Sequence, residues 1–430
     1  MVRKCSSARL SSFYCVTIRE IHGARAPPCD TQTKSVKQRV LIVHPVLEGH
    51  GGGQAVAAWT IQALRDSTEL TLLTKRKVDC DELNSYYGTA LKPSDFQIHY
   101  VPSIYDRIPA LMPFHGDFLK AAFLSRCCKW LIARQPFDVI ISTNNEFDFG
   151  TKGIQYVHFP WNATPGAANE HKLWNSWPRE SDKKRWYQFA GSVALYWGIC
   201  KWIGGISPER IRRNVTLANS EYTRGLIRGA YEIDSVVVHP PVPGGFPGIP
   251  WEQRESSFVA LGRQAPEKNW PQAVEILRLV RASGHPVRFT LIGSRDHPET
   301  ERQLAQLAKQ HSDWFTVHTN LLREQTIQIV ARHRYGIHCM VREHFGIAVA
   351  EFQRAGCIPF VHRSGGPMEI AGFDDRLMFE NSAEAAAKIS RVLEDEDLQR
   401  ELAAQANARA ALWTIETFMQ EIRRQVEEFS

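Results

Sequence analysis

Short apolar runs alternate with longer amphipathic segments from Val40 onward. In the first half of the chain, runs rich in β-branched residues predict strands at residues 40–44, 70–74, 97–101, 138–142, 154–158, 215–219 and 236–240. Segments with helical spacing, such as 54–66 and 118–134, lie between several of these runs. Strands that alternate with helices form βαβ crossovers, so the pattern predicts a parallel sheet with helices on both faces.

A stretch rich in proline and glycine interrupts this pattern at residues 240–253 and marks a domain boundary. A second series follows, with strands predicted at residues 257–262, 288–293, 315–319, 335–340, 358–362 and 376–380. We therefore expect an α/β protein with two Rossmann-like domains. The boundaries that we predict are 39–240 for the first domain, 241–253 for the linker, 254–411 for the second domain and 412–430 for a helix that could return to the first domain.

The net charge of the chain is concentrated at its beginning. Of the formal charge of +6, all is carried by the first 39 residues, which hold eight Lys or Arg against two acids. The rest of the chain is balanced, which argues against a basic groove for nucleic acid. Residues 1–38 are rich in Arg and Ser without a long apolar run, which fits a transit peptide, a disordered leader or extra sequence from an upstream start. We leave them out of the fold.

The nine cysteines are scattered, with no C-x-x-C pair and no regular framework. This usage favours a reducing, cytoplasmic compartment. The sequence also lacks H-E-x-x-H, G-x-S-x-G and zinc-ligand spacing, so metalloprotease, α/β-hydrolase and zinc-site classes have no support. Asp79 and Asp81 form a D-x-D, but they open a helical segment and are not assigned a metal.

One segment, residues 183–213, departs from the Rossmann pattern. Residues 186–206 are apolar on nearly all sides of a helix and have Lys and Arg on both flanks. The uninterrupted apolar run, residues 189–200, is shorter than the roughly 18 residues that a membrane span needs. Two interpretations stay open: a helix buried against the sheet, or a helix at a membrane interface.

The most informative motif lies at residues 342–367, directly after a predicted strand. Glu343 and Glu351 are separated by seven residues, and a helix is predicted to begin at Gly346 and to end at Gly356. The backbone N–H groups of Phe345, Gly346 and Ile347 at the helix start predict an anion site. With a phosphate there, Glu351 lies about two turns into the helix and is placed to accept hydrogen bonds from a ribose.

Other candidate residues follow strands and so lie at the carboxyl edge of a sheet, where open α/β folds bind ligands. Arg263 and Lys268 come from one loop of the second domain, and two cations there suit a diphosphate. Gly51, Gly52 and Gly53 follow the first strand, where glycine allows close approach of the backbone to a ligand. His158 ends another strand of the first domain. Asn219 and Ser220 are expected to cap a helix beginning at Glu221.

These motifs are familiar as a set. In order and spacing, HGGGQ (50–54), QYVHFP (155–160), LANSEYTRGLI (217–227), VVVHPPV (236–242), ALGRQAPEKN (260–269), FTLIGS (289–294) and EHFGIAVAEFQRAGCIPFVHRSGGP (343–367) resemble the retaining glycosyltransferases of family 4. The similarity runs from about residue 40 to residue 429 and is greatest to the α-1,2-mannosyltransferases that extend lipid-linked oligosaccharides from GDP-mannose. It implies the GT-B fold, two Rossmann-like domains facing across a cleft.

The resemblance also implies roles for the candidate residues. Glu351 would hold the nucleotide ribose, Glu343 would contact the donor sugar, and Arg263 with Lys268 would neutralise the diphosphate. The backbone of residues 345–347 would bind sugar and phosphate. His158 would lie near the reacting centre, and the glycines at 51–53 would approach the donor phosphates. No metal and no cofactor are expected, because the nucleotide sugar is a co-substrate.

The expected function is transfer of a hexose, with mannose from GDP-mannose favoured, to a glycan or lipid-linked glycan at the cytoplasmic face of a membrane. Three alternatives stay open: a transferase that uses a UDP-sugar, a sugar-nucleotide epimerase of the same fold, and a non-catalytic sugar-nucleotide binder. The segment at 183–213 resembles the membrane-associating region of the lipid-linked enzymes, which favours peripheral membrane contact. No nucleic-acid partner is expected.

Overall fold

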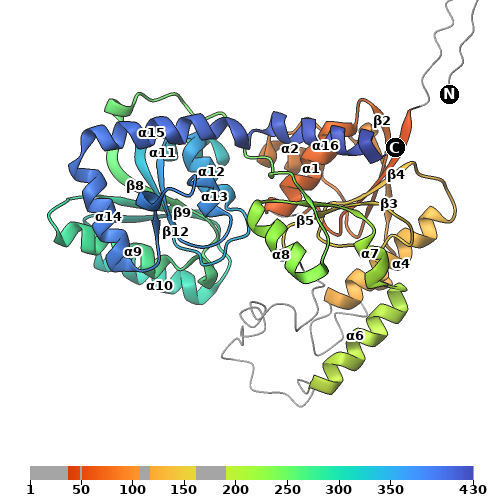
Figure 1. Cartoon of the computed structure of the whole chain (residues 1–430). Coiled ribbons are helices and arrows are strands. Elements are labelled where there is room, and N and C mark those ends of the chain that lie inside the picture. The colour runs from red at the N-terminus through yellow and green to blue at the C-terminus, as the bar shows by residue number, and fades with distance from the viewer. Residues whose placement is uncertain (1–36, 49–50, 106–116, 161–189, 430) are drawn as a thin grey trace, which may run out of the picture. The chain divides into compact units, whose positions relative to one another are not determined.

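The computed structural model describes residues 37–48, 51–105, 117–160 and 190–429 (Figure 1). Two parallel β-sheets organise these residues, one in each half of the chain. We call the elements of the first sheet the first lobe and those of the second sheet the second lobe. The predicted leader, residues 1–38, lies outside the described residues except for its last two positions.

The first lobe is a parallel sheet in the order β3-β2-β1-β4-β5-β6-β7. Its strands are β1 (Gln38–Val43), β2 (Thr68–Thr74), β3 (Phe96–Tyr100), β4 (Val139–Ser142), β5 (Ile154–Val157), β6 (Val215–Ala218) and β7 (Val236–Val237). Its helices are α1 (Gly52–Leu64), α2 (Cys80–Tyr87), α4 (Asp117–Ile132), α6 (Ala190–Gly204), α7 (Pro208–Arg212) and α8 (Glu221–Tyr231).

The second lobe repeats this architecture with the strand order β10-β9-β8-β11-β12-β13. Its strands are β8 (Glu255–Leu261), β9 (Phe289–Gly293), β10 (Phe315–Thr319), β11 (His333–His338), β12 (Ile358–His362) and β13 (Met378–Phe379). Its helices are α9 (Trp270–Ala282), α10 (Pro298–Gln310), α11 (Arg323–Arg332), α12 (Ile347–Arg354), α13 (Pro367–Ile370), α14 (Ser382–Glu394) and α15 (Glu396–Ala410).

Strand β1 shows why its last four residues, 40–43, are all apolar and buried. Val40 and Ile42 pack into one hydrophobic cluster of the first lobe, whereas Leu41 and Val43 pack into another. Successive side chains of a strand point to opposite faces, so a strand covered on both faces needs apolar residues throughout. The prediction of parallel sheets covered on both faces is confirmed.

Helix α16 (Ile415–Phe429) follows the second lobe in the sequence but packs on the first lobe, alongside α1 (Figure 1). Phe418, Ile422 and Val426 are buried in the same cluster as the residues of α1. The Nε of Arg423 donates to the carbonyl oxygen of Ala63 at 2.8 Å. This helix therefore completes the hydrophobic core of the first lobe.

Helix α6 occupies most of the apolar segment that the pattern singles out. Cys200 is buried against Leu119 and Phe123 of α4, so this face of α6 is a protein contact. On another face, Leu195 is 67% and Trp202 is 81% exposed. One face of α6 is therefore buried against α4, as the buried-helix interpretation predicts, and another presents apolar side chains to solvent. Residues 183–189 lie outside the described residues.

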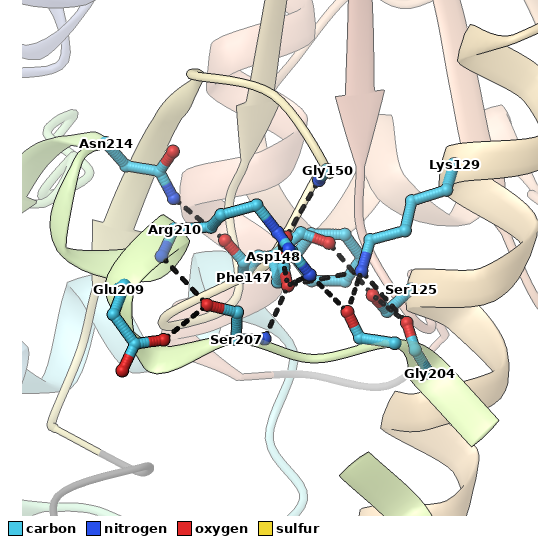
Figure 2. A network of polar contacts seen from close by, with 11 residues as sticks. Ser125, Lys129, Phe147, Asp148, Gly150, Gly204, Ser207, Glu209, Arg210 and Asn214 are labelled. Atoms are coloured by element: carbon cyan, nitrogen blue, oxygen red, sulfur yellow. Dashed lines mark hydrogen bonds and ion pairs between the residues drawn. The ribbon is translucent and has the colours of Figure 1, made fainter. Parts of the chain in front are cut away.

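A buried carboxylate fixes the helices that flank this surface (Figure 2). Asp148, whose side chain is fully buried, accepts from Nη2 of Arg210 at 2.8 Å and lies 3.2 Å from Nζ of Lys129. It also accepts from the backbone N–H of Ser207 at 2.7 Å and of Gly150 at 2.8 Å. Burial acts to raise the pKa of Asp148, but the bond from Arg210 and these backbone donors hold it below its usual range.

Lys129 links this network to the end of α6. Its Nζ donates to the carbonyl oxygen of Gly204 at 2.9 Å and of Gly205 at 2.7 Å. A cation at the C-terminus of a helix satisfies its last carbonyl groups and the negative end of its dipole. Asp148 and Lys129 therefore set where α6 ends and how it lies against α4.

Candidate functional site

The loop that bears Glu343 and the start of α12 is shaped by close backbone contacts. Gly346 precedes α12 with φ of +99°, in the left-handed region that favours glycine. A Cβ on Gly365 would lie 2.2 Å from the carbonyl oxygen of Glu343, and one on Gly366 would lie 2.4 Å from that of His344. The Ser-Gly-Gly-Pro turn thus supports the loop through backbone packing that no larger residue would allow.

Lys268 and Glu343 form a direct ion pair in the second lobe, with Nζ and Oε2 2.6 Å apart. Lys268 ends a short 3-10 helix, Pro266–Lys268, that follows β8, and Glu343 lies in the loop after β11. Burial acts to raise the pKa of Glu343, but the Lys268 ammonium and the His338 ring outweigh it and hold the pKa well below its usual range. The site therefore contains a cation and an ionised carboxylate at the carboxyl edge of the sheet.

Arg263 lies at the same edge but is paired differently. Its Nη2 is 2.7 Å from Oε1 of Glu267, and its Nη1 bonds to Asp296. Its side chain is 51% exposed. The sequence groups Arg263 with Lys268 as two diphosphate ligands, whereas in the structure Arg263 pairs with two carboxylates that Lys268 does not share.

Glu351 is buried in α12 and bonded to Arg323, the first residue of α11, with Nη1 and Oε1 2.5 Å apart. Arg323 is not among the site residues predicted from the sequence. A signal for it exists, because Arg323 follows β10 at the carboxyl edge of the sheet, the same position that singles out Arg263 after β8.

His158 follows β5, and both its backbone N–H and its backbone carbonyl oxygen are hydrogen-bonded to side chains. Its N–H donates to Oδ1 of Asn145 at 2.8 Å, and its carbonyl oxygen accepts from Nδ2 of Asn219 at 3.1 Å. Burial lowers the pKa of His158 to about 4, so the ring is neutral at pH 7. The ring Nε2 lies 3.1 Å from the carbonyl oxygen of Thr143, which can only accept. Nε2 therefore carries the proton, and Nδ1 is the acceptor that the ring can offer to a ligand.

The three glycines after β1 lie at the start of α1, which begins two residues before the helical segment predicted at 54–66. Gly51 is the N-cap of α1, and Gly52 and Gly53 form its first turn. None of the three has a positive φ, so backbone freedom does not explain them. Instead, a Cβ on Gly52 would lie 2.8 Å from Cδ1 of Ile347, and the hydroxyl of Tyr87 bonds to both the N–H and the carbonyl oxygen of Gly51 at 2.9 Å. Glycine here allows close packing.

Two polar side chains act as helix caps; the one at Ser220 is predicted, whereas Asn219, predicted to cap with it, donates to the carbonyl oxygen of His158 instead. Asp79 accepts from the N–H groups of Asp81 and Glu82 at the start of α2, so the D-x-D is a cap. Ser220 accepts from the N–H of Thr223 at the start of α8. Among the described residues, no group of three or more His, Cys, Asp or Glu side chains is arranged to hold a metal ion.

Hydrogen bonds also join the two lobes. The hydroxyl of Ser220 donates to the carbonyl oxygen of His344, beside Glu343. The backbone N–H of Glu221 donates to Oε2 of Glu369 in α13 at 2.9 Å, and His239 bonds to Oε1 of the same carboxylate at 2.7 Å. The loop that bears Glu343 is therefore bonded to the N-terminal end of α8 in the first lobe.

The second lobe also matches a known family. Residues 246–409 match the sequence profile described as "Glycosyl transferases group 1". We call this matched region the group 1 domain. This match includes Arg263, Lys268, Glu343 and Glu351, so the family resemblance seen in the sequence is confirmed for this lobe.

Two relatives of the chain carry the same name, "GDP-Man:Man(3)GlcNAc(2)-PP-Dol alpha-1,2-mannosyltransferase". The Homo sapiens protein is 25% identical over 225 residues, which are 46% of this chain and 45% of that relative. The Candida glabrata protein is 28% identical over 238 residues, 51% of this chain and 45% of that relative. The matched regions thus span less than half the length of these relatives.

The fold around the group 1 domain is that of GT-B glycosyltransferases. The structure of Anabaena Alr3699/HepE in complex with UDP and glucose is similar at a TM-score of 0.60 and 14% identity. The similarity covers 91% of this chain and 100% of that one. It extends over both lobes, so the GT-B fold predicted from the motifs is confirmed.

Proposed function

We propose that this chain is a nucleotide-sugar-dependent retaining glycosyltransferase that transfers mannose from GDP-mannose to a glycan or lipid-linked glycan. The observation that carries the proposal is the Lys268–Glu343 pair beside the start of α12, with Glu351 further along that helix, all within the group 1 domain. The names of the relatives support GDP-mannose as donor and a dolichol-linked glycan as acceptor.

The proposed reaction needs charge stabilisation more than a nucleophilic side chain. The bond between C1 of the sugar and the β-phosphate oxygen breaks, and its electron pair passes to the phosphate. Lys268, Arg263 and the backbone N–H groups at the start of α12 stabilise that developing charge. The acceptor oxygen bonds to C1 on the same face, and its proton passes to the departing phosphate. Nδ1 of neutral His158 accepts a hydrogen bond from a sugar hydroxyl.

The two glutamates are expected to act on different parts of the donor. Glu351→Ala should weaken binding of free GDP by roughly 1.5–3 kcal/mol, about 10- to 150-fold, because a charged acceptor for the ribose is lost. Glu343→Ala should leave free GDP binding nearly unchanged, since Lys268 keeps its charge, but should slow turnover of GDP-mannose. Titration calorimetry with GDP and initial rates with GDP-mannose measure the two effects.

Glu324→Ala is the matched control for this pair, because Glu324 is exposed and lies next to Arg323 on α11. It should change neither GDP binding nor turnover. Equal GDP affinities for wild type and Glu351→Ala would contradict the assignment of Glu351 to the ribose.

A UDP-sugar transferase and an epimerase are separated from this proposal by incubation of the protein with donor alone. An epimerase converts its nucleotide sugar without acceptor, whereas a transferase at most hydrolyses it slowly. Comparison of GDP-mannose with UDP-glucose and UDP-GlcNAc then identifies the donor. A protein that binds a nucleotide sugar but turns over none of them with any glycan acceptor would be a binder only.

We further propose that the exposed face of α6 contacts a membrane surface. No helix among the described residues is long and apolar enough to cross a bilayer. Leu195, Ile199 and Trp202 are exposed at helical spacing, and Lys201 lies beside them. Apolar side chains with an adjacent cation suit the headgroup region of anionic lipid.

Leu195→Ser combined with Trp202→Ser should therefore reduce co-sedimentation with anionic vesicles at low salt by about 10-fold or more, since each side chain loses apolar contact with lipid. Phe373→Ser is the control, because Phe373 is an aromatic residue of the second lobe that is 60% exposed. Wild-type protein that stays in the supernatant, or a double variant that sediments like wild type, would rule out this surface.

A further inference from the structure

Arg323 carries a buried polar atom that the proposed function leaves without a role. Its Nη1 donates to Glu351, but its Nη2 is buried with no hydrogen-bond partner in the part of the chain that the structure describes. A buried donor without a partner is costly, and most such groups in native proteins bind a ligand, an ion or water. Nη2 of Arg323 is therefore a candidate contact for the ligand of Glu351.

The guanidinium group is held in place from three directions. Arg323 is the first residue of α11, so its backbone belongs to a helix. Its Nη1 donates to the carboxylate of Glu351 in α12. The ring of Phe246 lies against it, with 5.4 Å from the Cζ atom to the ring centroid. The side chain is 23% exposed, and its Nη2 is buried beside the Nη1 that bonds to Glu351.

We infer that Arg323 determines which nucleotide base the donor site accepts; this inference rests on the proposed function. A nucleoside diphosphate is linear, with its ribose between the diphosphate and the base. If the diphosphate binds at Lys268 and the start of α12, and the ribose at Glu351, the base lies beyond Glu351. Arg323 is bonded to that carboxylate, so its Nη2 is placed to reach the base edge.

The chemistry of the guanidinium selects among bases. It has N–H donors and no acceptor, so Nη2 can bond only to an acceptor on the base. Guanine offers the keto oxygen O6 and uracil offers O4, whereas adenine and cytosine carry an amino donor at the equivalent position. Arg323 therefore favours keto bases and rejects amino bases. Glu351 can still accept from the ribose, because an ionised carboxylate has about four lone-pair sites.

The test is a binding panel with the full chain. Titration calorimetry with GDP, IDP and UDP, against ADP and CDP, should show that wild type binds the keto bases about 10- to 100-fold more tightly, the range of one good base contact. Arg323→Met should weaken GDP, IDP and UDP by about the same factor and leave ADP and CDP nearly unchanged. IDP keeps O6 but lacks the 2-amino group of guanine, so an equal loss for GDP and IDP assigns the contact to the O6 edge.

Arg332→Met is the matched control, because Arg332 is an exposed arginine at the other end of α11. It should leave the whole panel unchanged. Glu351→Gln should weaken all five diphosphates by a similar factor, since they share the ribose. If thermal melting shows that Arg323→Met does not fold, Arg323→Lys keeps a positive charge for Glu351 but loses the forked donors, and the same loss of base preference is expected.

Two results would overturn the inference: a wild type without preference for keto bases, or a uniform loss across all five diphosphates in Arg323→Met. The uniform loss would mean that Arg323 acts only through Glu351. A wild type that binds none of the five would refute the proposed donor site itself, and this inference with it, which distinguishes the two failures.

Discussion

Replacement of Lys268 by alanine is expected to lower turnover of the nucleotide sugar by about 10²- to 10³-fold, the usual effect of removing one group that stabilises developing charge. The affinity for free GDP should fall much less than turnover does, because Glu351 and the backbone at the start of α12 remain. Steady-state rates and GDP calorimetry separate the two effects. Lys309→Ala, at an exposed position of α10, is the control and should leave both unchanged.

The same substitution should alter the pH dependence of stability. In wild type the lowered pKa of Glu343 contributes stability that is present above the usual value of 4.5 and is lost as the pH falls through the folded-state pKa. Without Lys268 burial dominates and the pKa of Glu343 rises, so the variant regains stability as the pH falls and the carboxyl group is protonated. Denaturant unfolding from pH 4 to pH 8 tests this. Parallel pH profiles for the two proteins, or unchanged turnover, would contradict the role of the ion pair.

Replacement of Asp148 by asparagine is expected to destabilise the protein by about 3–5 kcal/mol, the range measured when one partner of a buried ion pair is removed. Arg210 and Lys129 would keep their charges, but the carboxylate that balances both would be gone. Because the pKa of Asp148 is lowered, the difference from wild type should be largest above about pH 4 and should shrink as the pH falls below it.

Asp234→Asn is the matched control for this prediction. Asp234 also pairs with an arginine, Arg224, but its side chain is 76% exposed, so its loss should have a much smaller effect. Denaturant unfolding of both variants, followed by far-ultraviolet circular dichroism, measures the difference. Equal stability of the two variants would mean that the Asp148 network does not hold the α4–α6 region together.

The strands were the most predictable part of the fold. Short apolar runs such as residues 70–74 and 358–362 are bounded by polar or turn residues. A strand that is buried on both faces needs such a run, because both sets of its side chains contact the core. The start of α1 was not predictable in this way. Glycine is a poor helix former, so Gly52 and Gly53 suggest a loop. The close neighbour of Gly52, the side chain of Ile347 at 2.8 Å from a Cβ built there, is distant in the sequence.

The sequence predicted which residues belong to the candidate site, but not which of them form ion pairs with one another. Glu343, Glu351 and Lys268 follow strands of one sheet, so their common edge follows from topology. Which of them meet depends on strand order and loop path. Lys268 follows β8 and Glu343 follows β11, which are neighbours in the sheet although 75 residues separate the two side chains. Arg323 was missed because a single arginine after a strand has no motif around it.

The position of α16 bears on how the protein folds as it is synthesised. Domains generally fold as units as they leave the ribosome, N-terminal domain first. Here the first lobe lacks Phe418, Ile422 and Val426 until the whole second lobe has been translated, and the bond between Arg423 and Ala63 joins residues 360 positions apart. The surface of α1 that α16 covers therefore stays open to solvent, and available to chaperones, throughout translation of the second lobe. The second lobe can complete its core first, which reverses the usual vectorial order.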